Sequence, residues 1–517
     1  MKIKFVFIGI FILLIIGAIQ MNKNLSQQQE FSKKVVRDST LRIECGMSGT
    51  SLFSNSAPVN VLESFLTLVL GQLIYINEDF NLNPGLLESY NYDTDKDIYY
   101  LSLKKDLIFH NGRKVNSKDL EYSILRGFFS KKKNWWPSFL GNIAGLEKIK
   151  PGMTYKSGLV SGLKIVDDFT ISISLKNPNP SFLHSLARSY FSLVPKEELK
   201  ADHLTWKKYP VGSGEYKVET YNKSKNQVVL KLVNKYHKKP NLILFSGTKL
   251  KSPDVILSGD VVRAGYQSES LLRSSKIITL FFNYKSPLGR NENFRKAIDF
   301  AIKRVDLISS ESPLKPTFHI VPRHIWGRKR VNESFSLVEA KKYIDQSKSD
   351  LKEHRYLNQT LIVPVYKVSE NEFNLKKLIN QLSSIGIRVR FYESTKKTNE
   401  EDFSEIPFRI SSLGADVVDP LVQYSLFSGS SFLYPQYPDD SQYKTLLEKA
   451  AKAKSIDTRS ISVREISEYF YNHRIALPLF ESSTRVYIKP HRFTSLGQQD
   501  GGTTFYADRV QFQRESQ

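Results

Sequence analysis

The chain contains a single cysteine, Cys45, among 517 residues. One thiol cannot form an intramolecular disulfide, a CxxC pair or a multi-cysteine zinc or iron–sulfur site. We expect Cys45 to be a small buried hydrophobe rather than a nucleophile. The stability of the chain must therefore come from packing.

The sequence also lacks the motifs of common enzyme sites. Its nine histidines include no HExxH pair and no His/Asp/Glu cluster at metal-ligand spacing. It has no GxxxxGK[ST] phosphate loop and no GxSxG nucleophile elbow. Gly212-Ser213-Gly214 lacks the third glycine and the following helix of a dinucleotide loop. These absences argue against a catalytic metal, a cofactor and an enzyme.

Long apolar runs are confined to the first 24 residues. Lys2 and Lys4 accompany an apolar run at residues 5–19 that contains no acid. Such a segment is typical of export signals rather than of a buried core helix, and it is shorter than the roughly 20 residues that span a bilayer comfortably. We predict a signal peptide or N-terminal anchor at residues 1–24, with cleavage and tethering through residues 5–19 both open. The rest should be a water-soluble body in the periplasm or another extracytoplasmic space.

The charge balance is strongly basic but diffuse. The 75 Lys and Arg residues against 52 Asp and Glu residues give a net charge of +23. No basic tail or arginine-rich arm concentrates the excess, so we expect no nucleic-acid partner. A solvated surface suited to an anionic envelope and a preference for anionic ligands both remain open.

Strand and helix signals alternate along the chain, which favours α/β architecture. Residues 98–103 have β-rich, partly alternating character, and a turn at Asn111-Gly112 follows. Asn116 should cap the next helix, because Asp119 occupies its third position and favours the free N–H groups there.

The second half contains a predicted helix at residues 292–308. Its apolar stripe should face a core, and its basic residues should lie largely on the other side. The stripe comprises Phe294, Ile298, Ala301, Val305 and Ile308, and the basic residues are Arg295, Lys296, Lys303 and Arg304.

A βαβ unit is predicted further along. Its strands are residues 361–365 and 387–391, its helix is residues 375–384, and Gly386 stops that helix. Helices at residues 443–454 and 459–474 then lead into an apolar strand at residues 475–480.

Several stretches, taken in order, resemble one known family. They are residues 82–89 (LNPGLLES), 109–120 (FHNGRKVNSKDL), 210–216 (PVGSGEY), 282–283 with 294–304, 378–389 and 475–479. Together they are similar to the family 5 extracytoplasmic solute-binding proteins of bacterial ABC importers, the oligopeptide- and dipeptide-binding group. The resemblance runs from about Leu41 to the C-terminus.

The resemblance implies a two-lobed α/β periplasmic-binding-protein fold of type II, with an extra subdomain and hinge crossovers. Lobe I would comprise residues 39–80, 206–278 and 488–517. Residues 81–205 would form its subdomain, and residues 279–487 would form lobe II.

The family's function implies that lobes close around a peptide and deliver it to an ABC permease in the inner membrane, with no catalysis. By position, Asp416 would pair with the ligand's α-ammonium, and Asp419 would support the same loop. Gly212 and Gly214 would shape a turn near the hinge. We expect a monomer without a metal or cofactor.

The sequence departs from the family at the acidic loop. Residues 413–420 keep Asp416 but lack the family's aromatic residues, and Glu215 replaces the usual proline of the glycine turn. Two alternatives therefore stay open. The same fold could bind a non-peptide solute, such as a nickel chelate, a sugar or an anionic solute, or the protein could be an envelope-anchored sensor or scaffold.

Overall fold

The computed structural model describes most of the chain beyond its N-terminal segment. The described residues are 40–47, 51–54, 57–77, 81–132, 134, 136–234, 239–257, 263–310, 312–331, 333–351, 359–366, 373–394, 406–414, 419–429, 437–499 and 504–513. The export segment predicted at residues 1–24 lies outside these ranges. Within them, no helix is long and apolar enough to cross a membrane.

The largest sheet has 11 strands. They are β1 (Thr40–Glu44), β8 (Tyr216–Asn222), β9 (Gln227–Leu232), β10 (Leu242–Ser246), β11 (Val255–Ile256), β12 (Gln267–Phe282), β13 (Lys315–Pro316), β14 (Leu361–Tyr366), β15 (Val389–Glu393), β16 (Phe408–Gly414) and β17 (Ala476–Ile488). Their order is β15-β14-β16-β12-β17-β11-β1-β10-β9-β8, and β13 pairs with β17.

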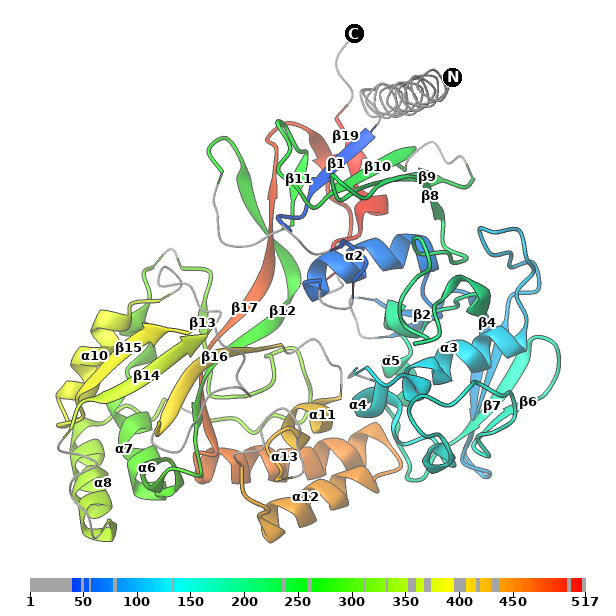
Figure 1. The fold of residues 1–517 in the computed structure, drawn as a ribbon. Coiled ribbons are helices and arrows are strands. Elements are labelled where there is room, and N and C mark those ends of the chain that lie inside the picture. Colours follow the sequence, from blue (N-terminus) through cyan, green and yellow to red (C-terminus); the bar gives the residue numbers. More distant parts are fainter. Residues whose placement is uncertain are drawn as a thin grey trace, which may run out of the picture.

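Two long strands, β12 and β17, join the halves of this sheet, as Figure 1 shows. They pair antiparallel from Gln267 opposite Ile488 to Phe281 opposite Ala476, with three register shifts between these ends. Such irregularities increase the local twist and bend the strands. We call β1 and β8–β11 the first sheet half, and β13–β16 with the adjoining ends of β12 and β17 the second sheet half.

Helix α2 (Val59–Leu70) covers the first sheet half. Its sequence is almost wholly apolar, and Leu62, Phe65 and Val69 are buried with strand residues such as Ile243 and Phe245 in one core. A small sheet of β18 (Phe493–Ser495) and β19 (Gln511–Phe512) and the 3-10 helix η5 (Ala507–Arg509) belong to the C-terminal segment beside it.

Residues 87–191 form a separate unit with its own sheet and core, which we call the four-stranded unit. Its sheet order is β4-β5-β7-β6, and every pair is antiparallel. Its elements are β4 (Leu87–Asp93), β5 (Ile98–Leu103), α3 (Ser117–Phe129), α4 (Trp136–Leu140), η1 (Leu146–Lys148), β6 (Leu163–Ile165), β7 (Thr170–Ser174), α5 (Phe182–Ser185) and η2 (Ser189–Phe191). A hairpin of β2 (Ile74–Ile76) and β3 (Leu82–Pro84) precedes it, and η3 (Lys196–Glu198) follows it.

The second sheet half is buried on both faces. Successive side chains of a strand point to opposite faces, so Leu280 and Phe282 enter one core and Phe281 enters the other. Helices α6 (Pro287–Arg290), α7 (Glu292–Ala301), α8 (Leu337–Asp350) and α10 (Leu375–Ser383) accompany the first core, and α11 (Pro420–Ser425), α12 (Ser441–Ala451) and α13 (Ile456–Asn472) accompany the second.

Most of the predicted elements are confirmed. Asn116 caps α3 in a capping box with Asp119. Strands β14 and β15 are parallel neighbours joined through α10, and Gly386 follows that helix at φ +83°, where a side chain would be strained. The predicted residue boundaries of the two lobes stay a prediction.

The helix predicted at residues 292–308 is wrong in its second half. α7 ends at Ala301, and the chain continues through an extended Ile302 into the 3-10 helix η4 (Arg304–Leu307). Val305 is 48% exposed, so it does not belong to the core stripe. The early stop lets Arg304 turn inward onto Asp299, with Nη2 and Oδ1 2.9 Å apart.

Two of the basic residues assigned to the outer side are also buried. Arg295 and Arg304 are 3% and 1% exposed. Arg295 donates to four backbone carbonyl oxygens, including those of Gly289 and His473, and Arg304 donates to Asp299 and to the carbonyl oxygen of Pro478. Arg295 therefore ties α7 to the end of α13, and Arg304 ties η4 to β17.

Candidate functional site

Of the two aspartates of the acidic loop, Asp416 lies outside the described residues and Asp419 lies within them. Asp419 is the N-cap of α11, and its Oδ1 accepts a hydrogen bond from the backbone N–H of Leu421 at 3.0 Å. Pro420 follows at the first helical position, where its missing N–H and fixed φ suit a helix start. Asp419 therefore holds the first turn of α11.

The charge of Asp419 is already neutralised. Its Oδ2 lies 2.7 Å from Nη2 of Arg459 on α13, and both side chains are only 5% exposed. Nη1 of Arg459 also donates to the carbonyl oxygen of Ala450 at the end of α12. One buried ion pair thus fastens α11, α12 and α13 together, and its carboxylate is not free to pair with a ligand.

The Asp419–Arg459 pair lies where helices α11–α13 approach the four-stranded unit. Tyr99 of β5 donates a hydrogen bond to the carbonyl oxygen of Asn179 at 2.8 Å. Burial raises the pKa of the Tyr99 phenol, and the positive charge of Arg459 acts against that rise. The guanidinium on α13 is therefore within electrostatic reach of the four-stranded unit, which Figure 1 shows opposite α11–α13.

The glycine turn packs directly on the C-terminal end of α2. A Cβ on Gly212 would lie 2.5 Å from both Val69 O and Leu70 Cα, and one on Gly214 would lie 2.2 Å from Leu68 O. The N–H of Gly214 donates to Val69 O at 3.0 Å. Glycine occupies both positions because the backbone of α2 approaches too closely to leave room for a Cβ. A left-handed backbone conformation is not the reason.

His110 connects this turn to the four-stranded unit. Its backbone N–H donates to Gly212 O at 2.8 Å, and its Nε2 lies 2.9 Å from Gly214 O. Burial lowers the pKa of His110, which favours the neutral ring with Nε2 as the hydrogen-bond donor. The turn between residues 210 and 216 is therefore a junction between the first sheet half and the segment that leads into α3.

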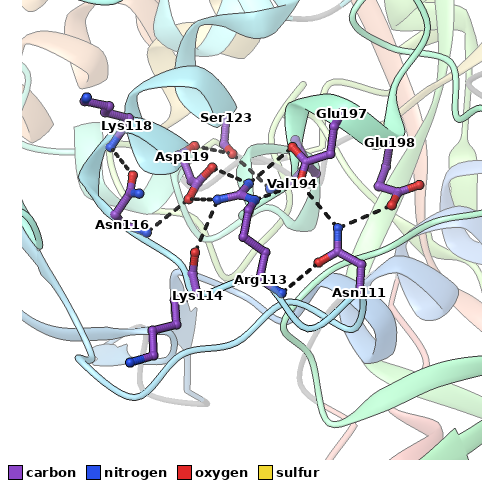
Figure 2. A network of polar contacts seen from close by, with 10 residues as sticks. All are labelled: Asn111, Arg113, Lys114, Asn116, Lys118, Asp119, Ser123, Val194, Glu197 and Glu198. Carbon is purple, nitrogen blue, oxygen red and sulfur yellow. Dashed lines mark hydrogen bonds and ion pairs between the residues drawn. The ribbon is translucent and has the colours of Figure 1, made fainter.

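The rest of residues 109–120 forms the polar network in Figure 2. Arg113 makes a bidentate pair with Asp119, with Nη1–Oδ2 and Nη2–Oδ1 distances of 2.9 and 2.7 Å. Its Nε donates to Glu197 Oε1 at 2.7 Å, and Asn111 contacts Glu197 and Glu198. This motif thus links the start of α3 to η3.

A small hollow of about 80 Å³ lies on the second sheet half. It has room for only a few waters. Two pairs of its polar groups contact each other: Tyr469 donates to Asp440 at 2.9 Å, and Nδ1 of His473 lies 2.9 Å from Glu292 Oε2.

The described residues offer little for metal or redox chemistry. Among them, no group of three or more His, Cys, Asp and Glu residues is placed to hold a metal ion. Cys45 is fully buried, and burial raises the pKa of its thiol, so it is a poor nucleophile.

Sequence reasoning gave no role to Arg113 or Arg459. The Glu197 partner of Arg113 lies 84 residues away, and the Asp419 partner of Arg459 lies 40 residues away. The spacing of nearby residues in the sequence does not indicate such pairs. The two glycines at residues 212 and 214 indicate a turn, but the sequence does not reveal the contact of that turn with α2.

Comparison with known proteins identifies the proteins that this chain resembles. Residues 81–246 match the family described as "Bacterial extracellular solute-binding proteins, family 5 Middle". The dipeptide-binding protein DppE of Bacillus subtilis is 21% identical over 461 residues, which cover 81% of this chain and 82% of DppE.

Solved structures share the fold. The periplasmic binding protein DppA of Helicobacter pylori, in complex with the peptide STSA, matches with a TM-score of 0.69 at 18% identity, covering 92% of this chain and 98% of that one. The substrate-binding protein CtaP of Listeria monocytogenes matches with a TM-score of 0.73 at 17% identity, covering 92% and 99%. These likenesses confirm the two-lobed α/β binding-protein fold, and the sequence matches make the chain similar to the family 5 bacterial extracellular solute-binding proteins, whose model matches residues 81–246.

Proposed function

We propose that this protein is the extracytoplasmic solute-binding component of an ABC importer, which binds a peptide between its lobes and delivers it to a permease. The observation that carries the proposal is the arrangement of separately packed units around β12 and β17, since two crossing strands permit hinge motion. The names of the relatives supply the ligand class: DppE is a dipeptide-binding protein, and DppA is in complex with a peptide.

The proposal includes finer points. The lobes would divide near residues 278 and 488, which lie in β12 and at the end of β17. The protein would act as a monomer and carry out no reaction of its own. Its N-terminal segment would export the body and, if retained, tether it beside the permease.

Asp416 remains the proposed partner of the peptide's α-ammonium. A buried ammonium is costly unless it is paired, and Asp419 is occupied by Arg459. The remaining acid of the loop is therefore the better candidate. Contacts to the extended backbone of a peptide would leave its side chains largely unread.

We expect Asp416→Asn to weaken binding of a tripeptide pool by about 30-fold or more, because losing one partner of a desolvated charge pair costs about 2–5 kcal/mol. Calorimetry on the full chain should show the same loss when the wild type meets the N-acetylated pool. Asp345→Asn, on the exposed side of α8, is the matched control and should bind like the wild type. If Asp416→Asn and acetylation both leave the affinity unchanged, the ammonium pair does not exist.

A further inference from the structure

The small hollow on the second sheet half has walls that are mostly aromatic. Five aromatic side chains line it: Tyr284, Phe427, Tyr437, Tyr443 and Tyr469. The ring centroids of Tyr284 and Tyr437 are 5.1 Å apart at 47°, and those of Phe427 and Tyr437 are 5.0 Å apart at 73°. Aromatic rings carry negative potential over their faces, and rings that meet at such angles leave these faces partly uncovered.

The hollow lies away from the four-stranded unit. Arg459, near the start of α13, is the part of that helix within electrostatic reach of the four-stranded unit. Tyr469 and His473, which line the hollow, lie at the other end of α13, about 15–20 Å from Arg459 at 1.5 Å per residue. Figure 1 shows this end of α13 beside the lower ends of β12 and β17, far from the first sheet half. The hollow is therefore separate from the place where a peptide would lie between the lobes.

Asp440 contributes a negative charge to the wall of the hollow. It is the N-cap of α12, where its Oδ1 accepts the backbone N–H of Tyr443 at 2.8 Å, and its Oδ2 accepts the hydroxyl of Tyr469 at 2.9 Å. Burial and this second hydrogen bond raise the pKa of Tyr469, so the phenol stays neutral. Both donors orient the carboxylate without cancelling its charge, and no cation among the residues that the structure describes forms an ion pair with it.

The other charged groups of the hollow already have partners. Glu292 lies 2.6 Å from Nζ of Lys296 and 2.9 Å from Nδ1 of His473. Arg295 donates to four backbone carbonyl oxygens, and its guanidinium carbon lies 4.6 Å from the ring centroid of Tyr284. One ring of the hollow thus already holds a cation on its face. The carboxylate at the start of α12 is the charge that remains uncompensated.

We propose that this hollow binds a methylated ammonium group. A quaternary ammonium ion has no N–H to donate, so aromatic ring faces and a nearby negative charge hold it better than hydrogen-bond acceptors do. Its bulk matches a hollow of about 80 Å³ with room for a few waters. A primary ammonium keeps its water more tightly and would lose more on entering an aromatic site. The site is additional to the proposed peptide site and does not rest on it.

The test is a titration with choline chloride, followed through the ligand's methyl NMR signal, on the full chain in a non-ionic maltoside detergent. A parallel titration uses dimethylbutanol, the neutral analogue in which carbon replaces the charged nitrogen. Asp440→Asn removes the charge but keeps a cap for α12 and an acceptor for Tyr469, and Tyr469→Leu removes one ring. Asp439→Asn changes an exposed acid next to the site and is the matched control. Thermal melting reports whether each variant folds.

We expect choline to bind the wild type saturably, and the neutral analogue to bind at least about tenfold more weakly. Asp440→Asn should weaken choline binding about tenfold, and Tyr469→Leu about fivefold, while Asp439→Asn binds like the wild type. If Tyr469→Leu fails to fold, Asp440→Asn decides the matter, because asparagine also caps helices. Binding of the tripeptide pool should be the same in all these variants.

Four results overturn the proposal. They are the absence of saturable choline binding, equal binding of choline and its neutral analogue, equal choline binding by the wild type and Asp440→Asn, and displacement of choline by the tripeptide pool. The last would place choline between the lobes, so the proposed function would stand while the site in the hollow falls. Failure of peptides to bind, with choline binding still dependent on Asp440, would contradict the proposed function and support this inference.

Discussion

Arg459→Met should lower the free energy of unfolding by about 3–5 kcal/mol, because it leaves the Asp419 carboxylate buried without its cation. The loss should appear as a lower urea midpoint in far-UV circular dichroism. Arg464→Met, an exposed arginine on the same helix, is the matched control and should change the midpoint little.

A double variant distinguishes the contribution of the ion pair to stability from the contribution of side-chain packing. Asp419→Asn keeps an acceptor for the N–H of Leu421 but removes the charge, so Asp419→Asn combined with Arg459→Met should recover part of the stability lost in Arg459→Met alone. If Arg459→Met unfolds at the same urea concentration as Arg464→Met, the pair does not fasten α11 to α13.

Gly214→Ala should destabilise the protein by about 3 kcal/mol or more, since its new Cβ would lie 2.2 Å from the backbone oxygen of Leu68. Backbone at the end of α2 cannot move away as a flexible side chain could. Thermal unfolding measures the effect, and Ser213→Ala, at the residue between the two glycines, should be close to neutral. Equal melting temperatures for Gly214→Ala and Ser213→Ala would show that the glycine turn does not pack closely against α2.

The sequence predicted the elements that local chemistry controls. Asn116 and Asp119 lie within one helical turn of each other, so the capping box could be recognised from their spacing. The βαβ unit was equally visible, because its strands are apolar runs and Gly386 provides the helix stop that requires positive φ. The six family-like stretches added the two-lobed fold.

Pairing over long distances in the chain was not predictable. The apolar run of β17 ends near Phe480, yet the strand continues to Ile488 because β12 provides the hydrogen-bonding partner. Charged residues usually lie outside, so the sequence pattern predicts Arg295 and Arg304 on the outer side, but each finds acceptors that come together only in the folded chain.

The central claim is that the two lobes move relative to each other when a peptide binds. Spin labels at Lys118→Cys in the four-stranded unit and Lys348→Cys on α8 would report their separation, because both positions are exposed and Cys45 is buried. A second pair, Lys118→Cys with Lys164→Cys, lies within the four-stranded unit and is the control.

Electron–electron resonance on the full chain, with and without the tripeptide pool, measures both distances. The account predicts that the pool shifts the distance distribution between Lys118→Cys and Lys348→Cys and leaves the control pair unchanged. An inter-lobe distribution that stays the same at saturating peptide concentration would contradict it.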